Sequence, residues 1–225
     1  MMRARTADVE GYVESNGVKI HHEVHGSGRP TILLLPSWTV VHKRFWKAQV
    51  PYLARHHRVV TYDGPGNGPS ERPLDPSAYD HDRQVRYALD VLDATDTDRA
   101  VVVGLSKGGC RALQLAAEHG DRVLGTVVID ASVPLTDNHA ARTTSRDPGD
   151  LPPSQTARLG RDPVEHWAKY DPTYWLRDYE DFLWFFFGMC FPEPRSTKSI
   201  EDCVAWGMET TPEVLVAEGR ATWPA

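Results

Sequence analysis

The chain is poor in cysteine and has no long apolar run. These two features argue against a disulfide-rich protein and against a membrane-spanning one. Only three cysteines occur in 225 residues, and their odd number and spacing fit neither a disulfide framework nor a metal site. We therefore expect Cys110, Cys190 and Cys203 to be reduced thiols in the cytoplasm. The longest apolar stretch, Phe182–Phe191, is shorter than the roughly 20 residues that cross a bilayer. The N-terminus lacks the apolar segment of a secretory signal.

An excess of basic charge is also lacking, because 31 acidic residues outnumber 25 basic ones. The formal net charge is −6, whereas a nucleic-acid binder needs a basic face to neutralise phosphates. No basic amphipathic helix stands out, so we expect neither a nucleic-acid partner nor a membrane partner. The hydrophobic fraction of 40% is ordinary for a soluble domain and is enough to build a sizeable core.

The first half of the chain alternates short apolar runs with segments of helical spacing. Residues 11–26 have the pattern of a hairpin around the turn Asn16-Gly17. Helical spacing separates the apolar runs that follow, which predict strands at 30–36, 58–64, 99–105 and 123–132. Strands that alternate with helices predict an α/β fold, with a mostly parallel sheet flanked by helices. After Ser132 comes a polar, proline-rich loop and then a helical segment heavy in aromatics.

A serine lies between two glycines at the end of one predicted strand. The segment Gly104-Leu105-Ser106-Lys107-Gly108 leaves an apolar run and enters a helical one, which is the context of a nucleophile elbow. Such a turn is so tight that side chains at positions 104 and 108 would collide with neighbouring backbone, and glycine removes the clash. The alternative interpretation is an ordinary glycine-rich turn between a strand and a helix.

These features resemble the α/β-hydrolase superfamily over residues 11–221. A loop motif strengthens the resemblance, because Asp63, Gly66, Gly68 and Ser70 match the family's Asp-x-x-Gly-x-Gly-x-Ser pattern. The resemblance implies a hydrolase core over residues 1–134 and, over residues 135–225, the polar loop and a helical lid. It also implies that the core is C-terminally incomplete, because the strands that carry the family's acid and histidine do not appear.

The resemblance also implies the roles of particular residues. Ser106 would be the nucleophile, and the backbone N–H groups of Trp38 and Lys107 would form the oxyanion hole. Pro36-Ser37 stands where the family commonly has His-Gly, but main-chain amides can still supply the donors. We expect the Lys107 side chain to be solvated and Asp63 to shape its turn.

No residue matches the family's general base. Beyond the elbow and the helix after it, only His139 and His166 remain, and neither lies in a Gly-x-Gly-His loop. Asp130, at the end of a strand, is either an unusual catalytic acid or a loop anchor. We expect the remaining histidines near helices, His42, His81 and His119, to lie at the surface.

Two functions stay open. The first is a serine hydrolase acting on an ester or related carbonyl substrate with an apolar part, without cofactor or metal. It would be weak or inactive as this chain because the catalytic histidine is missing. The alternative is a truncated, non-catalytic module that binds a ligand or a protein. In either case the strand at 123–132 would have an unpaired apolar edge, which favours self-association.

Overall fold

One six-stranded sheet organises the part of the chain that the structure describes. The computed structural model describes residues 5–131, 133, 167–195 and 197–222. The sheet has the strand order β1-β2-β4-β3-β5-β6. Its first two strands form an antiparallel hairpin, and β4, β3, β5 and β6 run parallel to one another. The predicted mostly parallel sheet is therefore confirmed. The strands are β1 (Val9–Ser15), β2 (Val18–His25), β3 (Thr31–Leu34), β4 (Arg58–Tyr62), β5 (Ala100–Leu105) and β6 (Val123–Ile129).

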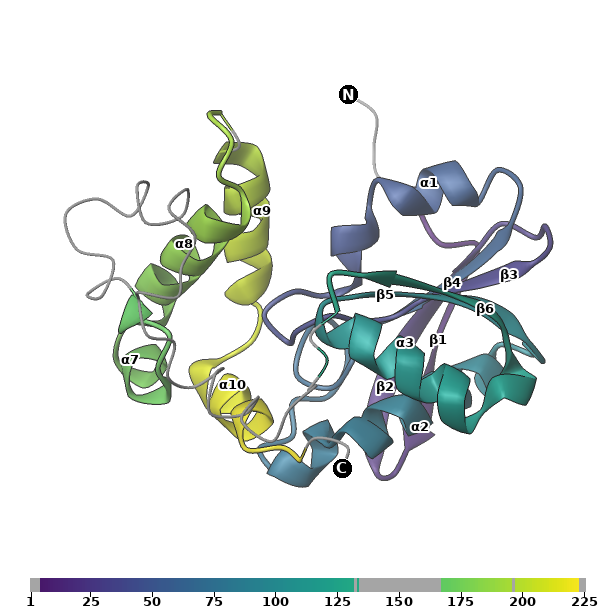
Figure 1. The fold of residues 1–225 in the computed structure, drawn as a ribbon, viewed down its shortest axis with the longest axis horizontal. Helices are drawn as coiled ribbons and strands as arrows, with labels where there is room; N and C mark the ends of the chain where they lie inside the picture. Colours follow the sequence, from purple (N-terminus) through teal and green to yellow (C-terminus); the bar gives the residue numbers. More distant parts are fainter. Residues whose placement is uncertain (1–4, 132, 134–166, 196, 223–225) are drawn as a thin grey trace.

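Helices flank the sheet, and Figure 1 shows α2 and α3 on one face and α1 on the other. A second group, α7 to α10, lies beside the sheet as a helical layer of its own (Figure 1). The helices of the first half are η1 (Lys43–Trp46), α1 (Gln49–Leu53), η2 (Pro76–Tyr79), α2 (His81–Ala94), α3 (Lys107–Glu118) and η3 (Gly120–Arg122). Those of the second group are α7 (Pro172–Arg177), α8 (Tyr179–Cys190), α9 (Thr197–Gly207) and α10 (Pro212–Gly219).

The central strand β3 shows why the sheet is covered on both faces. Its side chains alternate, and Ile32 and Leu34 pack with Val50 of α1. Leu33 and Leu35 point the other way, into the larger core that α2 and α3 close. A strand buried on both faces has no polar side, which explains the wholly apolar run in the sequence.

Two local predictions can be compared with the structure directly. Asn16 and Gly17 both have positive φ, 50° and 75°, which confirms the two-residue turn between β1 and β2. The apolar helical pattern from Phe45 to Leu53 forms two pieces, η1 and α1. Pro51 lies in the first turn of α1, where its missing N–H leaves no helical hydrogen bond unmade.

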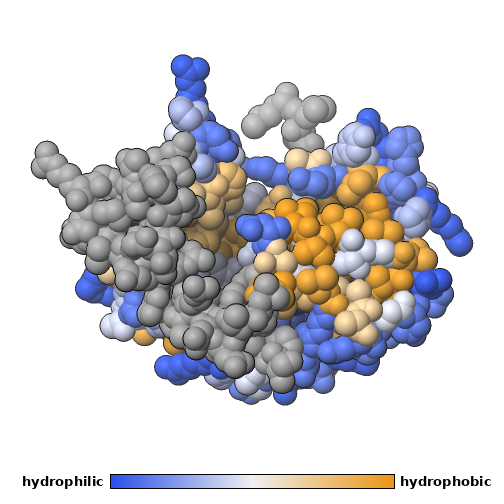
Figure 2. Space-filling view, in the orientation of Figure 1, coloured by the Kyte–Doolittle hydropathy of each residue, from blue (hydrophilic) through white to orange (hydrophobic). Residues whose placement is uncertain are grey.

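The strand β6 forms an open apolar edge. Leu124, Val127 and Ile129 are 47%, 46% and 41% exposed, respectively. Figure 2 shows hydrophobic side chains gathered on the face where β5, β6 and α3 lie in Figure 1. Exposed β-branched residues at a sheet edge offer unpaired backbone groups to another strand. Among the described helices, none is both long and apolar enough to span a membrane.

The helix α10 joins the two parts of the fold. Val214 and Ala217 belong to the core beneath the sheet, whereas Leu215 belongs to the aromatic cluster of the helical layer. We call the helices α7 to α10 the lid, as the sequence predicts for this segment. The exact division of the chain at residues 134 and 135 stays a prediction.

Candidate active site

Ser106 lies on a sharp bend between β5 and α3. Its φ and ψ are 54° and −120°, a conformation that L residues rarely adopt and that costs about 1–3 kcal/mol. The two flanking glycines are there because backbone approaches closely. A Cβ at Gly104 would lie 2.1 Å from the carbonyl oxygen of Gly108, and one at Gly108 would lie 2.5 Å from that of Pro36. The bend therefore has the geometry predicted for a nucleophile elbow.

The first amide of α3 is left without a helical partner. The N–H groups of Gly109 and Cys110 already donate to the Ser106 carbonyl, at 2.9 and 3.3 Å. Lys107 is the first residue of the helix, so its N–H has no carbonyl one turn earlier to bind. An unpaired N–H at the positive end of a helix favours a negatively charged atom nearby.

The second predicted oxyanion donor is on the loop that follows β3. In the described part of the chain no acceptor is recorded for the Trp38 N–H, so this donor is also open. The indole of Trp38 points into the lid, where Phe186 and Tyr170 lie 5.0 and 5.7 Å away between ring centroids. Trp175 and Phe182 complete the surroundings at 6.0 Å each. The lid therefore packs around the side chain of the residue that is predicted to supply the second donor.

A buried ion-pair group lies beside the elbow, and the sequence did not reveal it. The Glu218 carboxylate, on α10, lies 3.0 Å from Lys107 Nζ and 3.6 Å from the Arg111 guanidinium. The prediction of a solvated Lys107 side chain is therefore wrong, because the ammonium binds a buried carboxylate. Burial lowers the pKa of Lys107, while the neighbouring Glu218 opposes that shift. One signal was present: two cations in the first turns of a helix oppose its dipole and need a partner.

A small cavity borders the oxyanion loop. Its volume is about 10 Å³, room for about one water molecule. Its lining residues belong to the loops after β3 and β4 and to the helices α2 and α3, and include Pro36, Ser37, Trp38, Thr39, Gln84 and Arg111.

Among the described residues, no general base is hydrogen-bonded to the Ser106 hydroxyl. Within the ranges that the structure describes, no hydrogen bond is recorded for the Ser106 hydroxyl. The two candidate bases, His139 and His166, lie outside the described residues. Asp130 follows β6, where it is exposed and has a positive φ of 44°. Such a residue is well suited to turning the chain at the strand end.

Two histidines that were predicted to be at the surface are buried instead. His42 and His81 are each 4% exposed. His42 lies under Trp206 of the lid, with 5.4 Å between ring centroids, and burial lowers its pKa. Burial and the nearby charges of Arg111 and Lys107 lower the pKa of His81 to about 3. Both predictions failed because lid and core cover these residues through contacts that are distant in sequence.

The loop residue Asp63 does more than shape its turn. Its carboxylate is fully buried and accepts hydrogen bonds from the Lys43 backbone N–H at 2.8 Å and from Lys43 Nζ at 2.6 Å. Ser70 closes the loop by donating its hydroxyl to the Asp63 carbonyl at 2.7 Å. The motif therefore anchors η1 to the end of β4.

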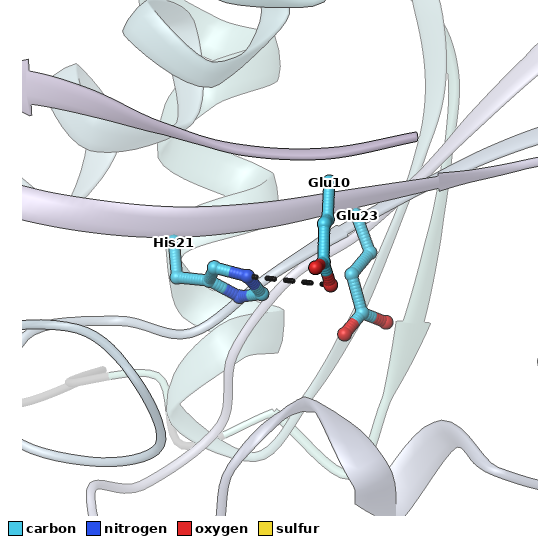
Figure 3. A group of neighbouring side chains, drawn as sticks. All are labelled: Glu10, His21 and Glu23. Atoms are coloured by element: carbon cyan, nitrogen blue, oxygen red, sulfur yellow. Dashed lines mark ion pairs between the residues drawn. The ribbon is translucent and has the colours of Figure 1, made fainter. Parts of the chain in front are cut away.

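One group in the described residues has the composition of a metal site. Figure 3 shows Glu10, His21 and Glu23 converging on the hairpin, with ligand atoms within 4.8 Å of one another. However, Lys43 Nζ lies 3.2 Å from Glu23 and 3.0 Å from His21 Nδ1. An ammonium only donates, so Nδ1 accepts and the imidazole proton lies on Nε2, the nitrogen that faces Glu10. Lys43 therefore supplies the cation that these acidic groups need.

Comparisons with known proteins agree on one family. The family model described as alpha/beta hydrolase fold matches residues 30–189. The 2-hydroxymuconate semialdehyde hydrolase of a Pseudomonas species is 38% identical over 117 residues, which are 51% of this chain and 38% of that protein. The 2-hydroxy-6-oxo-6-(2'-aminophenyl)hexa-2,4-dienoic acid hydrolase of Metapseudomonas resinovorans is 30% identical over 139 residues, 61% of this chain and 47% of that protein. The matched part thus spans less than half the length of these curated relatives.

Solved structures share the fold over most of this chain. An esterase from Exiguobacterium antarcticum superposes with a TM-score of 0.72 at 19% identity, covering 93% of this chain and 72% of the esterase. At that identity the likeness shows the fold alone.

Proposed function

The chain belongs to the alpha/beta hydrolase fold family, and from that premise we propose that it is a serine hydrolase with Ser106 as its nucleophile. The oxygen of Ser106 attacks the carbonyl carbon of an ester or related substrate. The backbone N–H groups of Trp38 and Lys107 stabilise the negative charge that develops on the carbonyl oxygen. The described residues supply neither the acid nor the base.

The observation that carries this proposal is the strained Ser106, which is followed by the open Lys107 amide and whose turn closely approaches the loop after β3 at Gly108. A φ of 54° is costly for serine, and the close approaches at Gly104 and Gly108 show that the whole turn is built around it. An ordinary turn between a strand and a helix also leaves its first helical N–H unpaired, but it needs neither a strained serine nor a glycine on each side of it. A displayed nucleophile and oxyanion donors explain both.

The substrate class follows from the surroundings of Trp38. Four aromatic side chains of the lid lie around this indole, so a small-molecule substrate with an apolar part fits the site best. Two relatives are named as a semialdehyde hydrolase and an oxo-dienoic acid hydrolase, and both names are of enzymes that act on small carbonyl compounds. A cytoplasmic location and the absence of a nucleic-acid partner remain predictions from composition.

We also propose that turnover by this chain is slow. A serine hydroxyl is a weak nucleophile without a base beside it, and losing the base of a triad typically costs on the order of a millionfold in turnover. About a thousandfold over water can survive from binding and the oxyanion hole. Weak hydrolysis is the expected behaviour.

A fluorophosphonate probe tests the nucleophile directly. Incubation at alkaline pH, followed by mass spectrometry of peptides, should find the phosphonate on Ser106. Ser106→Ala should abolish the label, while Ser27→Ala, at an exposed loop position, should leave it unchanged. A label spread over several surface serines, with Ser106 unmodified, would refute the proposed nucleophile.

The alternative, a non-catalytic binding module, is favoured by one observation, the apolar edge of β6. Copies of this chain would associate by pairing their exposed strands, which bury Val127 and Ile129. The double variant Val127→Lys with Ile129→Lys should then be monomeric in analytical ultracentrifugation where the wild type is not. A wild type that stays monomeric at high concentration would remove this alternative.

A further inference from the structure

The loop that carries the second oxyanion donor is held by a buried arginine. Arg111 is only 4% exposed, and its guanidinium donates to the carbonyl oxygens of Ser37 at 2.9 Å and Pro36 at 3.3 Å. Both hydrogen bonds come from one nitrogen, Nη1, whose two protons the planar guanidinium holds in fixed directions. Arg111 thus binds the peptide unit that immediately precedes Trp38.

That peptide unit contains the proposed donor itself. The carbonyl of Ser37 and the N–H of Trp38 belong to one planar trans amide, so they point in opposite directions. Holding the carbonyl oxygen against Arg111 therefore directs the Trp38 N–H away from the guanidinium. The positive charge at the carbonyl also polarises the amide and strengthens its N–H as a donor.

The other side of Trp38 is held by the partner of the same arginine. Glu218 accepts a hydrogen bond from the Thr39 N–H at 3.3 Å, and its carboxylate pairs with Arg111 and Lys107. One ion-pair group therefore holds the residues before and after Trp38. The same group contains the side chain of Lys107, whose backbone N–H is the first proposed donor. Glu218 is on α10, so the arrangement includes the lid.

We propose that Arg111 is a positioning residue of the oxyanion hole, orienting the Trp38 amide through the Ser37 carbonyl, and that Glu218 links this orientation to the lid. The inference rests on the proposed function. It adds to that function a residue pair that the nucleophile and the open amides do not require. A merely structural arginine would stabilise the fold without affecting one particular amide.

The test combines labelling kinetics with amide spectra of Arg111→Gln. At saturating fluorophosphonate, the phosphonylation rate of Ser106 should fall by about 10- to 100-fold, because removing a whole oxyanion donor costs about 100- to 1000-fold. The half-saturating probe concentration should change little. In ¹H–¹⁵N spectra of the labelled wild type, the amide protons of Trp38 and Lys107 should both move downfield. In the variant only that of Lys107 should move.

Two further variants keep the inference falsifiable. Arg111→Lys retains the charge but loses the longer, planar group whose donors point in fixed directions, so its rate should fall between those of the wild type and Arg111→Gln. Glu218→Gln should show a smaller loss of the same kind, and it substitutes for Arg111→Gln if that variant does not fold. Arg58→Gln is the matched control, because Arg58 also donates to a backbone carbonyl, that of Thr95, far from the elbow. It should label at the wild-type rate.

The outcomes separate this inference from the proposed function. If wild-type Ser106 is not labelled, the proposed nucleophile fails. Residual dipolar couplings of the Trp38 N–H in the unlabelled wild type and in Arg111→Gln then decide the inference alone, which requires a reoriented bond vector. If Ser106 is labelled but Arg111→Gln reacts at the wild-type rate with an unchanged Trp38 shift, the inference is overturned and the proposed function stands.

Discussion

The strand β5 ends in the elbow. The segments on its two sides differ in how many contacts hold them in place. On the side of β3, the oxyanion loop is held by backbone, by the buried pair Arg111–Glu218 and by the aromatic side chains of the lid. On the side of β6, apolar side chains are exposed, and the strand has no further partner among the described residues. The difference shows that the loop on the β3 side is firmly held, whereas no described group makes a hydrogen bond that would activate Ser106.

The largest expected effect comes from replacing a glycine at the elbow and comparing it with a glycine replaced in β6. Gly104→Ala places a Cβ 2.1 Å from backbone, so we expect a loss of about 4 kcal/mol or more in the free energy of unfolding, or no folded protein. Gly125→Ala in β6 meets no atom within 4 Å, so its stability should stay within about 0.5 kcal/mol of the wild type. Urea denaturation measures both. Equal effects would mean that the elbow is no more constrained than the open edge.

Two tryptophans make the next comparison, on the lid. Trp38 is 9% exposed among lid aromatics, so Trp38→Ala should cost about 3–5 kcal/mol of unfolding free energy. Trp184, on α8, is 45% exposed, and Trp184→Ala should cost less than about 1 kcal/mol. Chemical denaturation followed by far-ultraviolet circular dichroism gives both values. A small loss for Trp38→Ala would show that the lid does not hold the oxyanion loop.

The smallest expected effect is the dependence of stability on pH that comes from His81, which lies near the charges of Arg111 and Lys107. The pKa of His81 falls from 6.5 to about 3 on folding, so between these values the unfolded chain binds the extra proton. The contribution of His81 should therefore make stability fall as pH decreases below 6.5, by about 1.4 kcal/mol per pH unit.

Urea titrations at pH 7 and pH 5 measure that dependence. His81→Gln should reduce the loss of stability between the two pH values by about 2 kcal/mol, because the glutamine does not titrate. His56→Gln, which replaces an exposed imidazole, is the control and should behave as the wild type. An unchanged loss in His81→Gln would show that this imidazole is not held neutral by its surroundings.

The elbow was predictable because its signals are local. The glycines at 104 and 108, the apolar run before them and the helix after them lie within a short stretch, and the structure confirms the turn. The parallel sheet was predictable for the same reason, since each strand and helix shows its own periodicity.

The supports of the site were not predictable, because they join distant segments. Lys107 and Glu218 are 111 positions apart, and the sequence around either residue gives no indication that the other is its partner. The burial of His42 and His81 likewise depends on lid and core residues far along the chain. The sequence marked such contacts only indirectly, through two cations at the start of α3 that needed a partner.

The most direct test of the central claim is the pH dependence of the fluorophosphonate reaction at Ser106. If no group in the chain removes the serine proton, the rate should rise about tenfold per pH unit from pH 6 to pH 9 without levelling off. Rapid labelling that levels off above an apparent pKa near 6.5, and is lost in His139→Ala or His166→Ala, would contradict the account, because an imidazole would then be acting as the base.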